Sequence, residues 1–175
     1  MIEIKELNYA KMRGQSYSAE VCSEKFLSIE PNENGFEIEW KKSDSLLRKT
    51  LTDSILSDWL DNPIAYGAYE NEKLIGFVEG FLEKWNNRFR ISNICVFDTD
   101  KRNSGIGHML LKQIMIDAFK SNARMAVLET QSYNSKAISF YKKKGCEIIG
   151  FDRYAYSNNG PKEHNMRIEM GKSLK

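Results

Sequence analysis

A glycine-rich turn between an apolar strand and a helix is the segment of this sequence best suited to bind a ligand. Residues 91–107 read ISNICVFDTDKRNSGIG, so an apolar run ends near Phe97, a charged turn follows, and Arg102 precedes Gly105 and Gly107. Glycines let the backbone approach a ligand closely, and a helix N-terminus directs N–H groups at an anion. The segment therefore predicts a phosphate-binding turn.

The spacing excludes two common phosphate motifs. The dinucleotide fingerprint needs three spaced glycines and an acidic residue after the next strand, and a Walker loop needs Gly-Lys-Ser/Thr. Neither is present. Taken alone, the turn leaves open the plainer interpretation of a helix start beside an arginine.

Composition narrows the class of protein. The chain has 175 residues with 26 basic and 24 acidic side chains, which favours a single domain over residues 1–175 and gives little support for nucleic-acid or membrane binding. Three scattered cysteines and two histidines show no ligand spacing, so we expect no metal. The charged N-terminus and the lack of a long apolar run lead us to expect a cytoplasmic protein.

The N-terminal third gives weak structural signals. Residues 2–7 and 36–40 alternate like strands, whereas residues 9–30 are mixed and could line one or two helical faces. A helix is predicted over about 45–60, because its apolar residues recur every four positions: Leu47, Leu51, Ile55 and Trp59.

The remaining two thirds alternate strands and helices. Strands are predicted at 64–69, 73–83, 89–97, 125–129, 146–151 and 165–170. The helix after the glycine turn has an inner stripe of Met109, Leu110, Ile114, Met115 and Ala118, and Asn134 is placed to cap another helix. The pattern predicts a mixed α/β fold.

A second group of residues gives the glycine turn its context. The chain carries Leu128-Glu129-Thr130-Gln131, then Asn134, Ala137, Phe140-Tyr141 and Gly145. With the Arg102–Gly107 turn, these residues resemble the GCN5-related N-acetyltransferase (GNAT) superfamily over roughly residues 64–154. Four short motifs resemble those of the streptothricin N-acetyltransferases more narrowly: Trp85-Asn86, 128–131, 140–141 and Phe151-Asp152-Arg153-Tyr154. The resemblance implies a GNAT fold, with a mixed central sheet of about six to seven strands flanked by helices and with splayed central strands.

The resemblance also implies acetyl-CoA as cosubstrate. Backbone groups near Ile94 and Val96 would pair with the pantetheine arm, and the turn would wrap the pyrophosphate. Asn134 and Ala137 would contact the cofactor from the second motif. The implied cofactor-binding residues of the turn are Arg102, Asn103, Ser104, Gly105, Ile106 and Gly107.

Tyr141 matches the tyrosine that protonates the departing CoA thiolate in this superfamily. Acyl transfer needs a neutral amine, a polarised carbonyl and a proton for the leaving group, and a phenol can supply that proton. Without the resemblance, Phe140 and Tyr141 would be interpreted as aromatic packing. No enzyme nucleophile is required, so Cys95 and Cys146 are expected to be core residues.

An acceptor amine is a cation at neutral pH, so carboxylates and aromatic rings should surround it. Glu79 and Glu129 are the candidates for attracting the amine or relaying its proton. Asn93, Asp152 and Tyr154 are the candidate substrate contacts. Streptothricin-type relatives tend to carry acidic residues where this chain has Ser92 and Asn93, which leaves the general base open.

The resemblance therefore implies an acetyl-CoA-dependent N-acetyltransferase acting on an amine of streptothricin, at its β-lysine moiety, and conferring resistance to the drug. Transfer to another small amine or to a protein amine is the nearest alternative, and a non-catalytic CoA-binding module is the third. The expected partner is a small-molecule amine, with no nucleic acid or membrane, and a homodimer is left open.

Overall fold

The structure is a computed structural model that describes residues 1–98, 100–102 and 104–175; Asn103, a predicted cofactor residue, lies outside the described residues. The chain forms two compact units. The first consists of Met1–Glu20, Thr50–Val127 and Ser173–Lys175, and the second of Val21–Lys49 and Leu128–Lys172.

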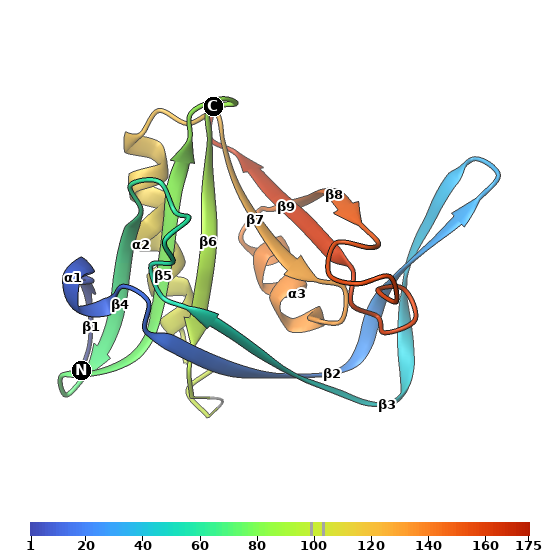
Figure 1. Cartoon of the computed structure of the whole chain (residues 1–175), viewed down its shortest axis with the longest axis horizontal. Coiled ribbons are helices and arrows are strands. Elements are labelled where there is room, and N and C mark those ends of the chain that lie inside the picture. Colours follow the sequence, from blue (N-terminus) through green and yellow to red (C-terminus); the bar gives the residue numbers. More distant parts are fainter. Residues whose placement is uncertain (99, 103) are drawn as a thin grey trace. The chain divides into compact units, whose positions relative to one another are not determined.

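The first unit is built on an antiparallel meander (Figure 1). Its strands are β1 (Ile2–Glu6), β4 (Ile64–Glu70), β5 (Lys73–Glu83) and β6 (Arg88–Val96), which are neighbours in that order and antiparallel to one another. Asn71 and Glu72 take positive φ values of 47° and 63° in the β4–β5 turn, as a tight hairpin requires. The meander confirms the strands predicted at 64–69, 73–83 and 89–97.

Helix α2 (Ile106–Lys120) packs on β4, β5 and β6. Its buried residues are Ile106, Leu110, Leu111, Ile114 and Ala118. The predicted stripe was wrong at Met109, which is 38% exposed. The buried row of the helix consists mainly of every fourth residue from Ile106 to Ala118. Met109 lies one position before Leu110 and therefore points away from the sheet.

The second unit holds the other end of the main sheet. Strand β7 (Met125–Gln131) begins in the first unit, next to β6, and ends in the second, where β9 (Arg167–Ser173) and β8 (Glu147–Asp152) follow it in the order β7-β9-β8. Helix α3 (Ser135–Lys143) begins after β7. The seven-stranded order β1-β4-β5-β6-β7-β9-β8 with its helices confirms the predicted α/β class.

The helical predictions for 9–30 and 45–60 were wrong. Helix α1 covers only Tyr9–Met12, and most of the other residues belong to two long strands, β2 (Ser16–Asn32) and β3 (Gly35–Ser54), in a separate two-stranded sheet. Residues 55–60 follow β3 and are neither helix nor strand. Apolar residues four apart share one face of a strand as well as one face of a helix, because four is an even number. Pairing with β2, which spacing cannot reveal, decided between the two.

None of the helices described within residues 1–98, 100–102 and 104–175 is long and apolar enough to cross a membrane.

Strand β6 leaves no room for a side chain at Gly76 of β5. A Cβ there would lie 2.6 Å from the Cys95 carbonyl oxygen and 3.2 Å from the Val96 Cα, both of them backbone atoms. We therefore expect Gly76→Ala to lower the free energy of unfolding by about 1–3 kcal/mol, as overpacking does, measured by urea denaturation. Gly150→Ala is the control, because its nearest new contact is a Glu169 side-chain oxygen at 3.6 Å. Equal stability of the two variants would contradict the close approach.

Candidate active site

The predicted phosphate-binding turn leads directly into α2. Gly105 is the residue before the helix and has a φ of 91°, a conformation that favours glycine. No side chain caps the helix, and its first turn has no acidic residue. The N–H groups of Ile106 and Gly107 are thus at an uncapped helix N-terminus, an arrangement that fits the phosphates of acetyl-CoA.

Arg102 connects this turn to the end of β6 and to the first part of β2. Its Nε donates to the Val96 carbonyl oxygen at 3.1 Å, and its Nη1 donates to the Glu20 carbonyl oxygen at 2.5 Å. Ser104 Oγ donates to the Lys101 carbonyl oxygen at 2.6 Å. These hydrogen bonds fix the side chains of Arg102 and Ser104 to backbone carbonyl groups of the protein. Ile94 and Val96 pair with Val78 and Gly76 of β5.

Glu79 lies at the centre of the first unit with no exposed surface. Its Oε2 accepts a hydrogen bond from the Leu56 backbone N–H at 2.7 Å, and its Oε1 accepts one from Asn93 Nδ2 at 2.7 Å. Burial raises the pKa of the Glu79 carboxyl above its usual value, because desolvation outweighs these hydrogen bonds. Glu79 thus contacts protein groups with both oxygens.

A β-bulge brings the neighbouring side chains to Glu79. The β5–β6 pairing shifts register so that Glu79 faces Asn93 while Gly80 faces Ile91, which leaves Ser92 as an extra residue in β6. Ser92 Oγ donates to the Glu79 carbonyl oxygen at 3.3 Å. The two positions that left the general base open in the sequence are thus both hydrogen-bonded to Glu79.

Asn93 extends the network toward two residues that sequence reasoning missed. Its Oδ1 accepts from the Tyr17 hydroxyl at 2.9 Å, and its Nδ2 also lies 3.4 Å from Asp53 Oδ2. Asp53 is exposed, so the network runs from a buried carboxylate through one amide to a carboxylate at the surface. Tyr17 and Asp53 could not be found from the sequence, because the segments that carry them were predicted to be helical and had no motif.

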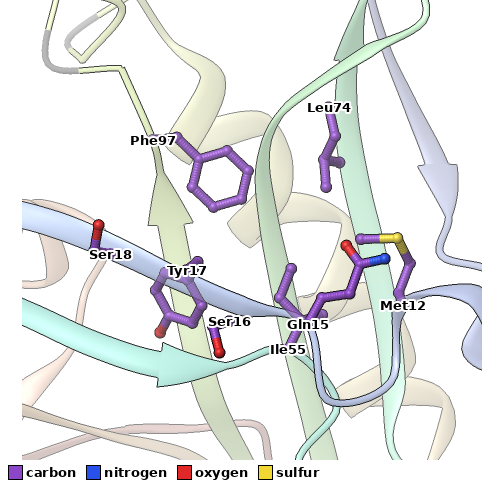
Figure 2. A pocket seen from close by; sticks show the side chains of 8 residues that line it. All are labelled: Met12, Gln15, Ser16, Tyr17, Ser18, Ile55, Leu74 and Phe97. Atoms are coloured by element: carbon purple, nitrogen blue, oxygen red, sulfur yellow. The ribbon is translucent and has the colours of Figure 1, made fainter.

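Tyr17 also forms part of a cavity of about 290 Å³ (Figure 2). Its ring packs edge-on against Phe77 at 4.9 Å between centroids, and Phe97 lies 6.1 Å away. The lining residues carry no formal charge; they are Met12, Gln15, Ser16, Tyr17, Ser18, Ile55, Leu74 and Phe97. The cavity suits an uncharged, partly apolar group.

In the second unit, α3 carries the predicted second motif. Asn134 caps the helix, because its Oδ1 accepts from the Ala137 N–H at 3.3 Å. Tyr141 is 6% exposed, and its ring contacts Phe140 edge-on at 5.2 Å. The burial of the Tyr141 phenol is therefore compatible with both interpretations, aromatic packing and a general acid.

The predicted substrate residues of the second unit gather around an arginine. Arg167 lies 4.0 Å from a Glu129 carboxylate oxygen and 3.6 Å from an Asp152 carboxylate oxygen, and the Tyr156 hydroxyl donates to Glu129 at 3.3 Å. The exposed Tyr154 donates its backbone N–H to Asp152 at 2.9 Å. Sequence reasoning missed Arg167 and Tyr156.

Tyr156 is 41% exposed, but desolvation of its hydroxyl and the nearby Glu129 carboxylate raise its pKa well above the usual range. Tyr156 therefore stays protonated at neutral pH. A signal for Arg167 existed in the opposite charges on the last two strands, where Asp152 directly faces Arg167.

Cys95 and Cys146 are half-buried thiols. Burial raises the pKa of Cys95 to about 11 and also raises that of Cys146, so both remain protonated at neutral pH and are poor nucleophiles. Among the residues that the structure describes, no group of three or more His, Cys, Asp or Glu side chains could hold a metal ion.

Comparisons with known proteins agree with this arrangement. The profile of the Acetyltransferase (GNAT) family matches residues 32–146. A streptothricin acetyltransferase of Escherichia coli is 30% identical over 125 residues, which cover 71% of this chain and 69% of that protein.

Two crystal structures share the fold along nearly the whole chain. A nourseothricin acetyltransferase superposes with a TM-score of 0.81 at 20% identity and covers 99% of both chains. An enzyme assigned as a streptothricin acetyltransferase, from Bacillus anthracis and solved with acetyl coenzyme A, has a TM-score of 0.77 at 23% identity and covers 100% of this chain and 98% of its own. With the sequence profile, the turn before α2 and the capped α3, the chain belongs to the GNAT family and is an N-acetyltransferase.

Proposed function

We propose that the enzyme transfers the acetyl group of acetyl-CoA to an amine of streptothricin, on the β-lysine moiety, and thereby confers resistance to the drug. The observation that carries this proposal is the 30% identity to the Escherichia coli streptothricin acetyltransferase over 71% of the chain. The proposed partner is a small-molecule amine in the cytoplasm, without nucleic acid or a membrane.

The donor fits the residues around α2. The uncapped helix N-terminus after Gly105 offers backbone N–H groups to the phosphates, and Arg102 holds that turn against the end of β6. In this proposal Asn134 and Ala137 contribute from the start of α3, and the β6 backbone at Ile94 and Val96 receives the pantetheine arm. When bound, acetyl-CoA supplies an acetyl group already activated as a thioester.

Tyr141 is the proposed general acid. Its phenol holds a proton at Oη, which the proposal assigns to the departing thiolate. Tyr141 is 6% exposed, so bulk water has little access to its hydroxyl.

Carboxylates are proposed to handle the acceptor amine. Glu79 would receive the amine proton through intervening water, since its own oxygens are engaged by the Leu56 N–H and the Asn93 amide. A raised pKa brings a carboxylate nearer to the operating pH of a general base. Glu129 and Asp152 would attract the cationic drug, with Tyr154 as an exposed aromatic contact.

The substrate assignment is tested by thioester consumption with purified protein. We expect acetyl-CoA-dependent release of free CoA with streptothricin, and mass spectrometry should find one acetyl group on the β-lysine moiety. A polyamine, an aminoglycoside and a peptide amine are the comparison acceptors. Turnover only with one of these would overturn the streptothricin assignment, and CoA binding without turnover of any amine would favour a binding module.

The role of Tyr141 is tested by Tyr141→Phe, which removes only the hydroxyl. We expect kcat to fall by about 10²–10⁴-fold, the usual contribution of a general acid, while the Kd for acetyl-CoA from calorimetry changes little. Tyr133→Phe is the control, because Tyr133 is also buried and directly precedes the start of α3. Unchanged turnover in Tyr141→Phe would remove Tyr141 from the mechanism.

The raised pKa of Glu79 is tested by measuring the free energy of unfolding as a function of pH. Because the folded-state pKa is raised above the usual value of 4.5, ionising Glu79 costs stability as pH rises from about 4.5 through the folded pKa. A glutamine amide cannot ionise, so the unfolding free energy of Glu79→Gln relative to wild type should increase over that window, by about 1.4 kcal/mol per unit of pKa elevation.

The hydrogen bond lost in Glu79→Gln adds an offset that does not vary with pH. Urea denaturation between pH 4 and 8 measures the difference, with Glu6→Gln on the exposed side of β1 as control. A difference that falls with pH would show that the Glu79 pKa is lowered by folding.

A further inference from the structure

Three polar side chains of the first unit meet at the amide of Asn93, and together they form the Asn93 cluster (Tyr17, Asp53 and Asn93). Asn93 Oδ1 accepts from the Tyr17 hydroxyl at 2.9 Å, and Asn93 Nδ2 lies 3.4 Å from Asp53 Oδ2. The three residues come from β6, β2 and β3. Asp53 is exposed, and Tyr17 and Asn93 are half-buried, so a solute can reach the cluster from solvent.

The hydrogen bonds within the Asn93 cluster engage all of its side-chain donors. The Tyr17 hydroxyl has one proton, which it donates to Asn93 Oδ1. The Asn93 amide nitrogen has two protons, and it donates to Glu79 Oε1 at 2.7 Å and to Asp53 Oδ2 at 3.4 Å. An ionised carboxylate has no proton to donate. The cluster can therefore offer a ligand only hydrogen-bond acceptors: the Tyr17 oxygen, Asn93 Oδ1 and the Asp53 carboxylate.

The negative charge of Asp53 is paired with no lysine, arginine or histidine side chain in the described part of the chain. One Asp53 oxygen accepts from the backbone N–H of the next residue at 2.7 Å, and the other lies 3.4 Å from Asn93 Nδ2. Glu129 and Asp152, by contrast, share Arg167. Of these three carboxylates, Asp53 is therefore the one with its charge left for a cationic ligand.

Neighbouring residues hold the Asn93 cluster in position. The Tyr17 ring packs edge-on against Phe77, and the Phe97 ring lies 6.1 Å from it between centroids. The buried Glu79 carboxylate accepts from the nitrogen of the Asn93 amide, so the amide oxygen faces Tyr17. Groups that are already ordered lose little conformational entropy when a ligand binds. The cluster is thus an ordered set of hydrogen-bond acceptors with one negative charge.

We propose that the Asn93 cluster binds the ammonium group of the substrate amine before its proton is removed. A primary ammonium group has three N–H donors and no acceptor, which matches the acceptor oxygens of the three side chains. This position brings the nitrogen next to the Asn93 amide, which contacts Glu79, the proposed proton acceptor. The inference rests on the proposed acetylation of a primary amine, and it does not depend on which molecule carries that amine.

A pair of ligands with and without the ammonium group tests the proposal. The probes are streptothricin and its N-acetylated product, titrated by calorimetry into enzyme saturated with CoA, which has no acetyl group to transfer. Asp53→Asn removes the charge and retains the shape of the side chain. We expect this variant to bind streptothricin about 10–100-fold more weakly, the usual effect of losing a hydrogen bond to a charged group, and the acetylated product at most about twofold more weakly.

Two further variants separate ligand binding from damage to the fold. Tyr17→Phe removes only the hydroxyl and keeps the ring that packs on Phe77, and it should weaken binding of streptothricin by about 3–10-fold while the acetylated product is little affected. Asp58→Asn is the matched control, because it removes an exposed carboxylate that already pairs with Arg13 at 2.8 Å. It should bind both probes like the wild type.

The proposal is overturned if Asp53→Asn or Tyr17→Phe binds streptothricin like the wild type. It is also overturned if either variant weakens binding of both probes equally, as a disturbed fold would, or if Asp58→Asn has the same effect as Asp53→Asn. Should streptothricin not be turned over, the substrate assignment fails, and the comparison amine with the highest turnover and its acetylated form become the two probes. The two failures are therefore distinguishable.

Discussion

The first unit depends on the burial of one carboxylate. Glu79 has no exposed surface, yet it is satisfied by the Leu56 N–H and by the Asn93 side chain, each at 2.7 Å. A buried polar group without partners would cost far more than one with them. The turn after β3, the middle of β5 and the bulge in β6 must therefore keep their relative positions, because each contributes an atom to this network.

The bulge at Ser92 makes this network possible. In a regular strand, successive side chains point to opposite faces, so Ser92 and Asn93 could not both reach Glu79. The extra residue changes the direction of the side chains that follow it in β6. The Asn93 amide then connects Glu79 with Tyr17 and lies near Asp53. A chain that lacks carboxylates at positions 92 and 93 thus still gathers carboxylates around that strand, from β3 and β5.

In the second unit, the carboxylates lie near the surface and pair with an arginine. Its predicted acceptor carboxylates, Glu129 and Asp152, are exposed and share Arg167 between them. This arginine offsets part of the negative charge of both carboxylates. Exposed pairs of this kind contribute little to stability, and their value lies in the arrangement of charge.

The sequence by itself determined the α/β class, the meander from β4 to β6, the glycine turn before α2 and the Asn134 cap of α3. Each of these depends on local signals, namely period-two alternation, a positive-φ glycine or a capping side chain, which act over a few residues. The strand predicted at 36–40 lies within β3, but the helices predicted over 9–30 and 45–60 were wrong, because apolar residues four apart, such as Leu47 and Leu51, fit a strand as well as a helix. Only pairing between β2 and β3 resolved that ambiguity. The same long-range contacts brought Tyr17 and Asp53 to Asn93, and no local pattern encodes a partner 76 residues away in the chain, as Asn93 is from Tyr17.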